Sequence, residues 1–174
     1  MPVDVEFRRQ VLDINIKAKL QFCYQCNKCT TDCPVANNAT KPYNPRQIML
    51  QALLGLKEPL LNAPDNFNLY GCTACDTCDE VCPGDLELTE VFMLLKNLMA
   101  QGSKAPKAYV GQAKAIADSG YAIPLQAAID RRRDQMGLPK ATLAKADEIK
   151  SLFAAVGFPE RVKFPAAEPK EANE

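Results

Sequence analysis

The sequence predicts an all-α fold, and three observations support that class. Apolar residues recur at helical spacing in several segments. These segments begin with residues that cap helices and end at glycine. Residues 35–71, which join two cysteine-rich stretches, are poor in the alternating β-branched residues that mark strands. We therefore expect the regular structure of the chain to be helical.

The first clear helix lies between the two cysteine-rich stretches, in the segment NPRQIMLQALLGL. Asn44 is placed to act as its N-cap, Pro45 suits the first helical position, and Gly55 follows its end. Its apolar face is predicted to consist of Ile48, Met49, Ala52 and Leu53.

A second helix is predicted after the later cysteine-rich stretch, in LTEVFMLLKNLMAQG. Thr89 is expected to cap its start and Gly102 to end it. The residues with i, i+3, i+4 and i+7 spacing are Val91, Leu94, Leu95 and Leu98.

The remainder of the chain after Gly102 is also predicted to be helical and contains no cysteine. Helices are expected in APKAYVGQAKAIADSG, in IPLQAAIDRRRDQMGLP, and from about Asp147 to Val156. The last of these carries an apolar stripe made by Ile149, Leu152, Phe153 and Val156. Residues 165–174 have the composition of a disordered tail. Residues 1–21 form an N-terminal segment whose pattern changes from helical to alternating.

All eight cysteines lie in two runs with the same spacing, CYQCNKCTTDCP and CTACDTCDEVCP. Each run reads C-x2-C-x2-C-x3-C-P. Disulfides would require an oxidising compartment, and the sequence shows no export signal. Structural zinc sites draw four thiolates from two separated pairs and do not need the third closely spaced sulfur. This spacing is instead the bacterial ferredoxin pattern for [4Fe–4S] clusters.

In that pattern the fourth cysteine of each run ligates the other cluster. The predicted ligands of one cluster are Cys23, Cys26, Cys29 and Cys82, and those of the other are Cys72, Cys75, Cys78 and Cys33. Pro34 and Pro83 are expected to turn the chain after the shared ligands. The acidic residues inside the runs, Asp32, Asp76 and Asp79, are interpreted as solvated loop or cap residues.

The fold class is thus an all-α helical dicluster ferredoxin with additional C-terminal helices. We expect a ferredoxin domain with two [4Fe–4S] clusters in residues 22–102 and a C-terminal helical region in residues 103–164. The long helical link argues against the common small ferredoxin, whose paired motifs lie in β-hairpins.

Composition excludes several classes of function. The chain has no histidine, which removes His-based acid–base catalysis and His-ligated metal sites. Basic and acidic residues number 21 each, so composition gives no support for a nucleic-acid or membrane partner. No apolar run approaches the length that spans a bilayer, and we expect a cytoplasmic protein. No catalytic residue is predicted, because every cysteine is assigned to a cluster.

The stretches CYQCNKCTTDCPVA, PRQIML, GCTACDTCDEVCPGDLELTEVFMLLKNLM and GLPKATLAKADEIKSLFAAVGF resemble the iron–sulfur C subunit of CoB–CoM heterodisulfide reductase. The resemblance covers residues 22–158 and matches the family's cysteine motif at every position. In that family the C subunit is a helical ferredoxin that lies between two larger proteins. These are the flavin-containing A subunit, and the B subunit, which reduces the mixed disulfide of coenzyme M and coenzyme B in methanogenesis.

The resemblance implies that this chain is a non-catalytic electron-transfer protein that relays electrons from the A subunit to the B subunit of heterodisulfide reductase. A hydrogenase or formate dehydrogenase would feed the A subunit, and the isolated chain would have no activity. Three alternatives stay open. They are the relay subunit of a related sulfur-oxidation complex, the iron–sulfur subunit of a succinate- or glycerol-3-phosphate-type dehydrogenase, and a structural or redox-sensing module.

Overall fold

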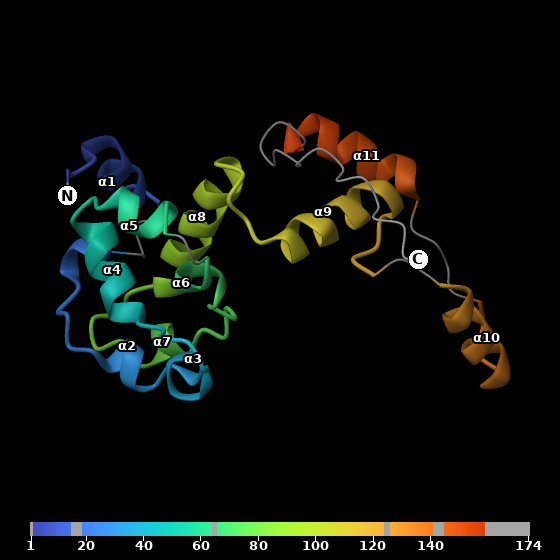
Figure 1. Cartoon of the computed structure of the whole chain (residues 1–174), viewed down its shortest axis with the longest axis horizontal. Helices are drawn as coiled ribbons and strands as arrows, with labels where there is room; N and C mark the ends of the chain where they lie inside the picture. Colours follow the sequence, from blue (N-terminus) through green and yellow to red (C-terminus); the bar gives the residue numbers. More distant parts are fainter. Residues whose placement is uncertain (1, 15–18, 64–65, 124–125, 141–144, 159–174) are drawn as a thin grey trace, which may run out of the picture. The chain divides into compact units, whose positions relative to one another are not determined.

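A computed structural model describes residues 2–14, 19–63, 66–123, 126–140 and 145–158. All regular structure in these ranges is helical, which confirms the predicted all-α fold (Figure 1). The chain divides into two compact units, and the boundary lies between Ala105 and Pro106. We call them the N-terminal unit and the C-terminal unit. In the described ranges, the helices are too short or too polar to cross a membrane.

The N-terminal unit contains eight α-helices and one 3₁₀ helix in the described ranges. These are α1 (Val5–Leu12), η1 (Leu20–Phe22), α2 (Lys28–Thr31), α3 (Pro34–Asn38), α4 (Pro45–Leu53), α5 (Lys57–Leu61), α6 (Phe67–Tyr70), α7 (Thr77–Glu80) and α8 (Leu88–Gln101). The C-terminal unit contains α9 (Lys107–Ser119), α10 (Ala127–Gln135) and α11 (Ala146–Ala155). All three helices predicted for the C-terminal region are therefore present.

The hydrophobic core of the N-terminal unit is built around α4 and α8. Helix α4 contributes Ile48, Met49 and Ala52, as its sequence pattern predicted, whereas Leu53 of the predicted face is only half-buried. Helix α8 contributes Val91 and Leu95 to the core, whereas Leu94 and Leu98 are only half-buried. The fully buried residues of α8 also include Leu88, Phe92 and Met99. The cysteines Cys23, Cys29, Cys33, Cys72, Cys78 and Cys82 pack against this core.

Helix α1 is held against the C-terminal end of α4 by hydrogen bonds around Gly55. The backbone N–H of Asp4 donates to the carbonyl of Gly55 at 2.9 Å, and Arg8 Nε donates to the carbonyl of Leu53 at 2.7 Å. Gly55 has a φ of +72°, and a Cβ there would lie 2.8 Å from the carbonyl oxygen of Asp4. Glycine is therefore required both by the left-handed turn and by the close approach of α1.

The starts of the two long helices differ from each other. Asn44 caps α4 as predicted, because its side chain accepts the N–H of Gln47 at 3.0 Å. The prediction that Thr89 caps α8 is wrong, since Glu87 holds the N-cap position and Thr89 lies inside the helix. The physical reason is that a carboxylate from another helix takes the place of the capping hydroxyl. Asp79 Oδ1 accepts the N–H of Thr89, in the first turn of α8, at 3.0 Å. Gly102 ends α8 as predicted.

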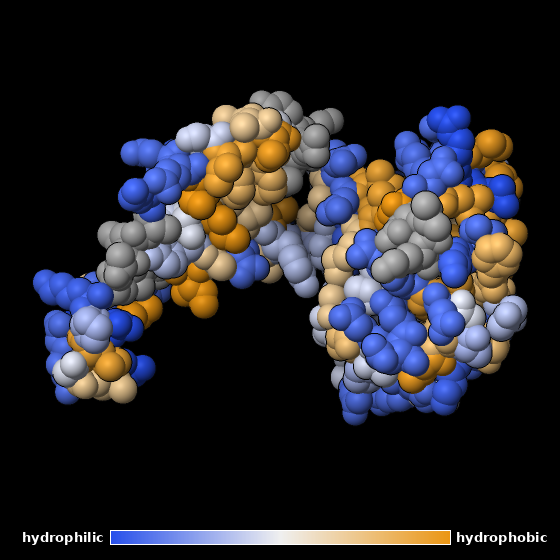
Figure 2. All heavy atoms as spheres, turned by 180° about the vertical axis from the view of Figure 1, so that it is seen from behind, coloured by the Kyte–Doolittle hydropathy of each residue, from blue (hydrophilic) through white to orange (hydrophobic). Residues whose placement is uncertain are grey.

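In the C-terminal unit, α9 packs against α11. Phe153 and Phe158 stack with ring centroids 4.3 Å apart. The predicted stripe of α11 is only partly covered, because Leu152 is 60% exposed and Val156 is 54% exposed. On the face drawn in Figure 2, hydrophobic side chains of this unit gather at the surface beside hydrophilic ones. The predicted tail of residues 165–174 lies outside the described residues, as do residues 15–18.

Candidate iron–sulfur site

The two cysteine runs adopt the same backbone conformation. Gln25 and Asn27 have φ of +56° and +72°, and the matching residues Ala74 and Asp76 have φ of +52° and +59°. A short helix then follows in each run, α2 in the first and α7 in the second. Paired left-handed residues turn the backbone sharply, which keeps the three closely spaced cysteines in one compact loop. The repeated spacing in sequence is thus a repeated structure.

Two hollows of similar size lie at these loops. The first hollow is bordered by four cysteines: Cys23, Cys26, Cys29 and Cys82. The second hollow is bordered by the other four: Cys33, Cys72, Cys75 and Cys78. Each hollow thus gathers three cysteines from one run and the last cysteine of the other run.

The crossing follows from the packing of α2 against α7. Cys33 follows α2 and Cys82 follows α7, so the contact between these helices carries each fourth cysteine to the opposite run. Pro34 then begins α3, where its ring suits the first helical turn. In the described part of the chain, no three His, Cys, Asp or Glu side chains are grouped closely enough to hold a single metal ion.

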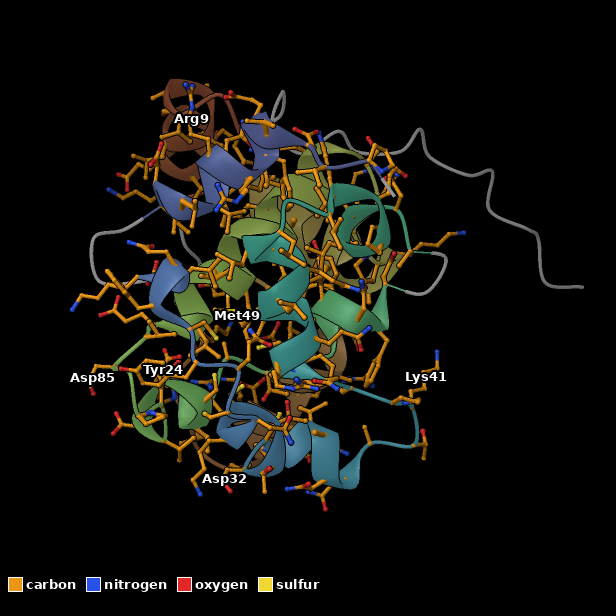
Figure 3. The ribbon with its side chains drawn as sticks, turned by 90° about the vertical axis from the view of Figure 1, so that its left-hand side faces the viewer. Arg9, Tyr24, Asp32, Lys41, Met49 and Asp85 are labelled. Carbon is orange, nitrogen blue, oxygen red and sulfur yellow. The ribbon has the colours of Figure 1, made fainter. Side chains whose placement is uncertain are left out.

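The cysteines differ in exposure. Cys26 and Cys75, which occupy matching positions, are exposed, and the other six are half-buried. Figure 3 shows sulfur atoms gathered beneath α4, on the side of Met49 toward α2 and α7. Tyr24, Asp32, Lys41 and Asp85 lie at the periphery of the same unit (Figure 3). Each hollow therefore has one cysteine at the surface and three deeper ones.

Polar groups surround the sulfurs of both hollows. At the first hollow, Gln25 Nε2 donates to Cys23 Sγ at 3.2 Å. At the second, the backbone N–H of Ala74 donates to Cys72 Sγ at 3.4 Å. Cys75 Sγ lies 3.4 Å from Thr77 Oγ1. Hydrogen bonds of this kind stabilise negative charge on sulfur.

Burial and neighbouring charge separate the thiol pKa values. Burial raises the pKa of Cys29 to about 11, and burial together with the Asp79 carboxylate raises that of Cys78 to about 12. Hydrogen bonds from Thr77 lower the pKa of Cys75. Of the three thiols, Cys29, Cys75 and Cys78, the exposed Cys75 is thus the easiest to deprotonate for metal binding.

Two residues at the hollows were not singled out by sequence reasoning. Tyr43 is 6% exposed and borders the second hollow, where its hydroxyl lies beside Cys72 but makes no hydrogen bond of ordinary geometry. Gln25 borders the first hollow, and its buried Oε1 also lacks a partner. Burial and the nearby cysteines raise the pKa of Tyr43, so its hydroxyl stays protonated. Tyr43 carries no sequence signal because it is brought to the hollow by packing, whereas Gln25 is placed by the local loop of its own run, between Cys23 and Cys26.

Aspartates of the second run were expected to be solvated loop or cap residues. Asp79 is half-buried and accepts the Thr89 N–H, so it caps the helix that follows its run. Asp76 is exposed at the start of α7. Beside the second run lies an acidic groove of about 1010 Å³, bordered by Asp76, Asp79, Glu80, Asp85, Glu87 and Glu90 together with Leu86 and Thr89.

Comparison with known proteins agrees with the arrangement of the cysteines. A family model described as a 4Fe-4S dicluster domain matches residues 19–86, which include both runs. The chain therefore contains a 4Fe–4S dicluster domain with its eight cysteines in two groups.

Similarity extends well beyond that domain. The chain is 31% identical to the iron-sulfur C 2 subunit of CoB–CoM heterodisulfide reductase of Methanocaldococcus jannaschii over 92% of this chain and 86% of the relative. It is 33% identical to the C2 subunit of the H(2)/formate:CoB-CoM heterodisulfide,ferredoxin reductase of Methanococcus maripaludis over 84% of this chain and 80% of the relative. A third relative is the C subunit of the H(2):CoB-CoM heterodisulfide,ferredoxin reductase of Methanothermobacter marburgensis. It is 28% identical over 83% of this chain and 79% of the relative. The chain belongs to the heterodisulfide reductase C-subunit family of iron–sulfur electron-transfer proteins.

Proposed function

We propose that this chain binds two [4Fe–4S] clusters and relays electrons between the A and B subunits of a heterodisulfide reductase. Cluster 1 would be held at the first hollow by Cys23, Cys26, Cys29 and Cys82, and cluster 2 at the second hollow by Cys72, Cys75, Cys78 and Cys33. The observation that carries the proposal is this division of eight cysteines into two groups of four, each with a member from the other run.

The chemistry of each hollow fits an anionic iron–sulfur group. Four thiolates are the usual ligand set of a [4Fe–4S] cluster, and each binds a different iron. The buried Tyr43 hydroxyl is costly without an acceptor, and sulfur at the second hollow would supply one. Gln25 already directs an N–H at a ligand sulfur of the first hollow. These donors suit a bound cluster better than an empty apolar cavity.

A relay also requires two separate approaches from the surface. Cys26 and Cys75 are exposed and belong to different hollows, so each cluster would come closest to solvent at its own cysteine. Once bound by four cysteines, such clusters take up and release single electrons and offer no open iron to a substrate. We therefore infer that the disulfide is reduced in a partner protein and that this chain alone has no activity.

The names of the relatives support the choice of partners. The Methanococcus maripaludis relative is named for hydrogen or formate, and the Methanothermobacter marburgensis relative for hydrogen. We infer that the A and B subunits bind this chain and that a hydrogenase or formate dehydrogenase feeds the A subunit. We place the cluster domain in residues 22–102, the helical region that follows it in residues 103–164, and the complex in the cytoplasm.

Serine substitutions test the crossed ligand sets. In anaerobically reconstituted protein, Cys33→Ser and Cys72→Ser should both remove cluster 2 and leave the electron paramagnetic resonance (EPR) spectrum of cluster 1. Cys29→Ser should remove cluster 1 and give the complementary spectrum. Each variant should retain about four of about eight irons. The crossed assignment is wrong if the EPR spectrum of Cys33→Ser matches that of Cys29→Ser instead of that of Cys72→Ser.

The relay role has a separate test. Purified chain with an artificial electron donor should not reduce the mixed disulfide, whereas addition of the A and B subunits should restore turnover. Disulfide reduction by the chain alone would contradict the proposal. Zinc in place of iron, or far fewer than about eight irons per chain, would contradict the cluster assignment itself.

A further inference from the structure

One matched pair of positions differs in charge between the two cysteine runs. Thr30 and Asp79 each follow the third cysteine of their run, and each lies in the short helix of that run. Thr30 Oγ1 accepts the N–H of Arg46 at 3.1 Å, and Asp79 Oδ1 accepts the N–H of Thr89 at 3.0 Å. Both residues thus cap the long helix that follows their run. A neutral hydroxyl performs that task in one run, so the task does not require the charge of Asp79.

The charge of Asp79 lies directly beside a predicted ligand. Asp79 Oδ1 is 3.4 Å from Cys78 Sγ, an arrangement in which the thiol donates to the carboxylate. A metal-bound thiolate carries no proton, so the carboxylate would then face an anionic sulfur. Thr30 at the matching place is uncharged, and its hydroxyl donates to Asn44 Oδ1 at 3.1 Å.

The other charged residues at the two hollows also make the second hollow more negative than the first. Lys28 and Arg46 border the first hollow, whereas the charged residue that borders the second is Asp76, at the edge of the acidic groove. Two contacts work against this difference. Lys28 is paired with Asp32 at 2.7 Å, and Lys96 donates to the backbone carbonyl of Cys72 at 2.7 Å. Arg46 and Asp79 keep the contrast in charge between the two hollows.

Hydrogen-bond donors lie at both hollows and act against this difference in charge. Gln25 directs a side-chain N–H at Cys23 in the first hollow. At the second hollow, Tyr43 brings a buried hydroxyl, and the hydroxyl oxygens of Thr77 and Thr89 lie 3.4 Å from Cys75 Sγ and 3.8 Å from Cys78 Sγ. These neutral donors oppose the effect of Asp79, whose full negative charge lies 3.4 Å from Cys78 Sγ.

We propose that cluster 2 has the lower reduction potential of the two clusters, because Asp79 places a carboxylate against Cys78 where Thr30 places a neutral hydroxyl in the other run. This inference rests on the proposed function. Reduction adds a negative charge to a cluster, and a nearby carboxylate disfavours that charge. The first hollow would then be the preferred position for a single electron held by the chain.

Two reciprocal substitutions test the assignment in the full chain loaded with both clusters. Asp79→Asn removes the charge and keeps an oxygen to accept the Thr89 N–H. Thr30→Asp adds a charge and keeps an acceptor for the Arg46 N–H. The control is Glu6→Gln, which removes an exposed charge paired with Arg9 in α1. Figure 3 shows Arg9 at the opposite end of this unit from Asp32.

The readout is an EPR-monitored redox titration that gives one midpoint for each cluster. Asp79→Asn should raise the lower midpoint and leave the higher one unchanged. At a fixed solution potential, the ratio of reduced to oxidised cluster 2 should rise about tenfold. For a one-electron couple this corresponds to an upward shift of about 59 mV in its midpoint potential. Thr30→Asp should lower the higher midpoint by a similar amount, and Glu6→Gln should change neither.

The proposal is overturned if Asp79→Asn raises the higher midpoint, leaves both unchanged, or shifts both equally. If Asp79→Asn fails to load iron, Thr30→Asp decides by the same criteria. Failure of the proposed function would look different, since wild-type chain would then lack about eight irons or two titrating clusters. Two clusters with equal potentials would overturn this inference and leave the proposed function intact.

Discussion

Replacement of Tyr43 by phenylalanine should lower the reduction potential of cluster 2. The Tyr43 hydroxyl is buried at the second hollow beside Cys72, and it makes no hydrogen bond of ordinary geometry in the protein. Left unpaired, such a group costs about 1–3 kcal/mol, whereas a hydrogen bond to a charged acceptor contributes about 1.5–3 kcal/mol. We expect the hydroxyl to donate to sulfur of cluster 2, so that Tyr43→Phe deletes this bond without a change in shape.

The magnitude follows from how the bond depends on redox state. Reduction makes the sulfur more negative and strengthens its hydrogen bond with the Tyr43 hydroxyl. We take the hydrogen bond to be stronger in the reduced state by about 1 kcal/mol, which is a part of its total energy. For a one-electron couple, about 1.4 kcal/mol corresponds to about 59 mV, so loss of the bond should lower the midpoint by about 40 mV. The sign is negative because the bond favours the reduced state.

The assay is a redox titration of the loaded chain, with Tyr24→Phe as the control. Tyr24 is 71% exposed and borders the other hollow, so its substitution should leave the midpoint of cluster 2 unchanged. Iron content should stay the same in both variants. An unchanged or higher midpoint of cluster 2 in Tyr43→Phe would refute the reasoning, as would an equal shift of both clusters.

Two further predictions concern the fold and the thiols. Gly55→Ala should lower the free energy of unfolding by about 2 kcal/mol, because φ is +72° and the new Cβ would lie 2.8 Å from a carbonyl oxygen. Gly102→Ala, whose Cβ would meet nothing closer than 3.4 Å, should change it by less than about 1 kcal/mol in anaerobic denaturant unfolding. Equal losses in the two variants would contradict this account. In metal-free chain near neutral pH, iodoacetamide should modify Cys75 before Cys29 and Cys78, as mass spectrometry of peptides can measure. The pKa of Cys75 is lowered by hydrogen bonds, and those of Cys29 and Cys78 are raised by burial, so Cys75 has the larger thiolate fraction near neutral pH. Equal rates of modification would contradict this order of pKa values.

The structure confirms the helices that carry strong local signals. Helix α4 begins after Asn44 and ends before Gly55, because a side-chain cap and a left-handed glycine act within a few residues. The start of α8 was misplaced at Thr89 for the opposite reason. Its capping oxygen comes from Asp79, which lies in another helix, and no local pattern reveals an acceptor brought in by packing.

Sequence alone determined the cofactor class and the helical architecture of this protein. Spacing of cysteines and periodicity of apolar residues are local properties, and both can be read directly along the chain. Tertiary structure alone decided which groups surround each set of cysteines. Tyr43 borders the second hollow and Asp79 accepts the Thr89 N–H of α8 through the packing of separate helices, whereas Gln25 and Asp79 lie beside their cysteines within the runs themselves.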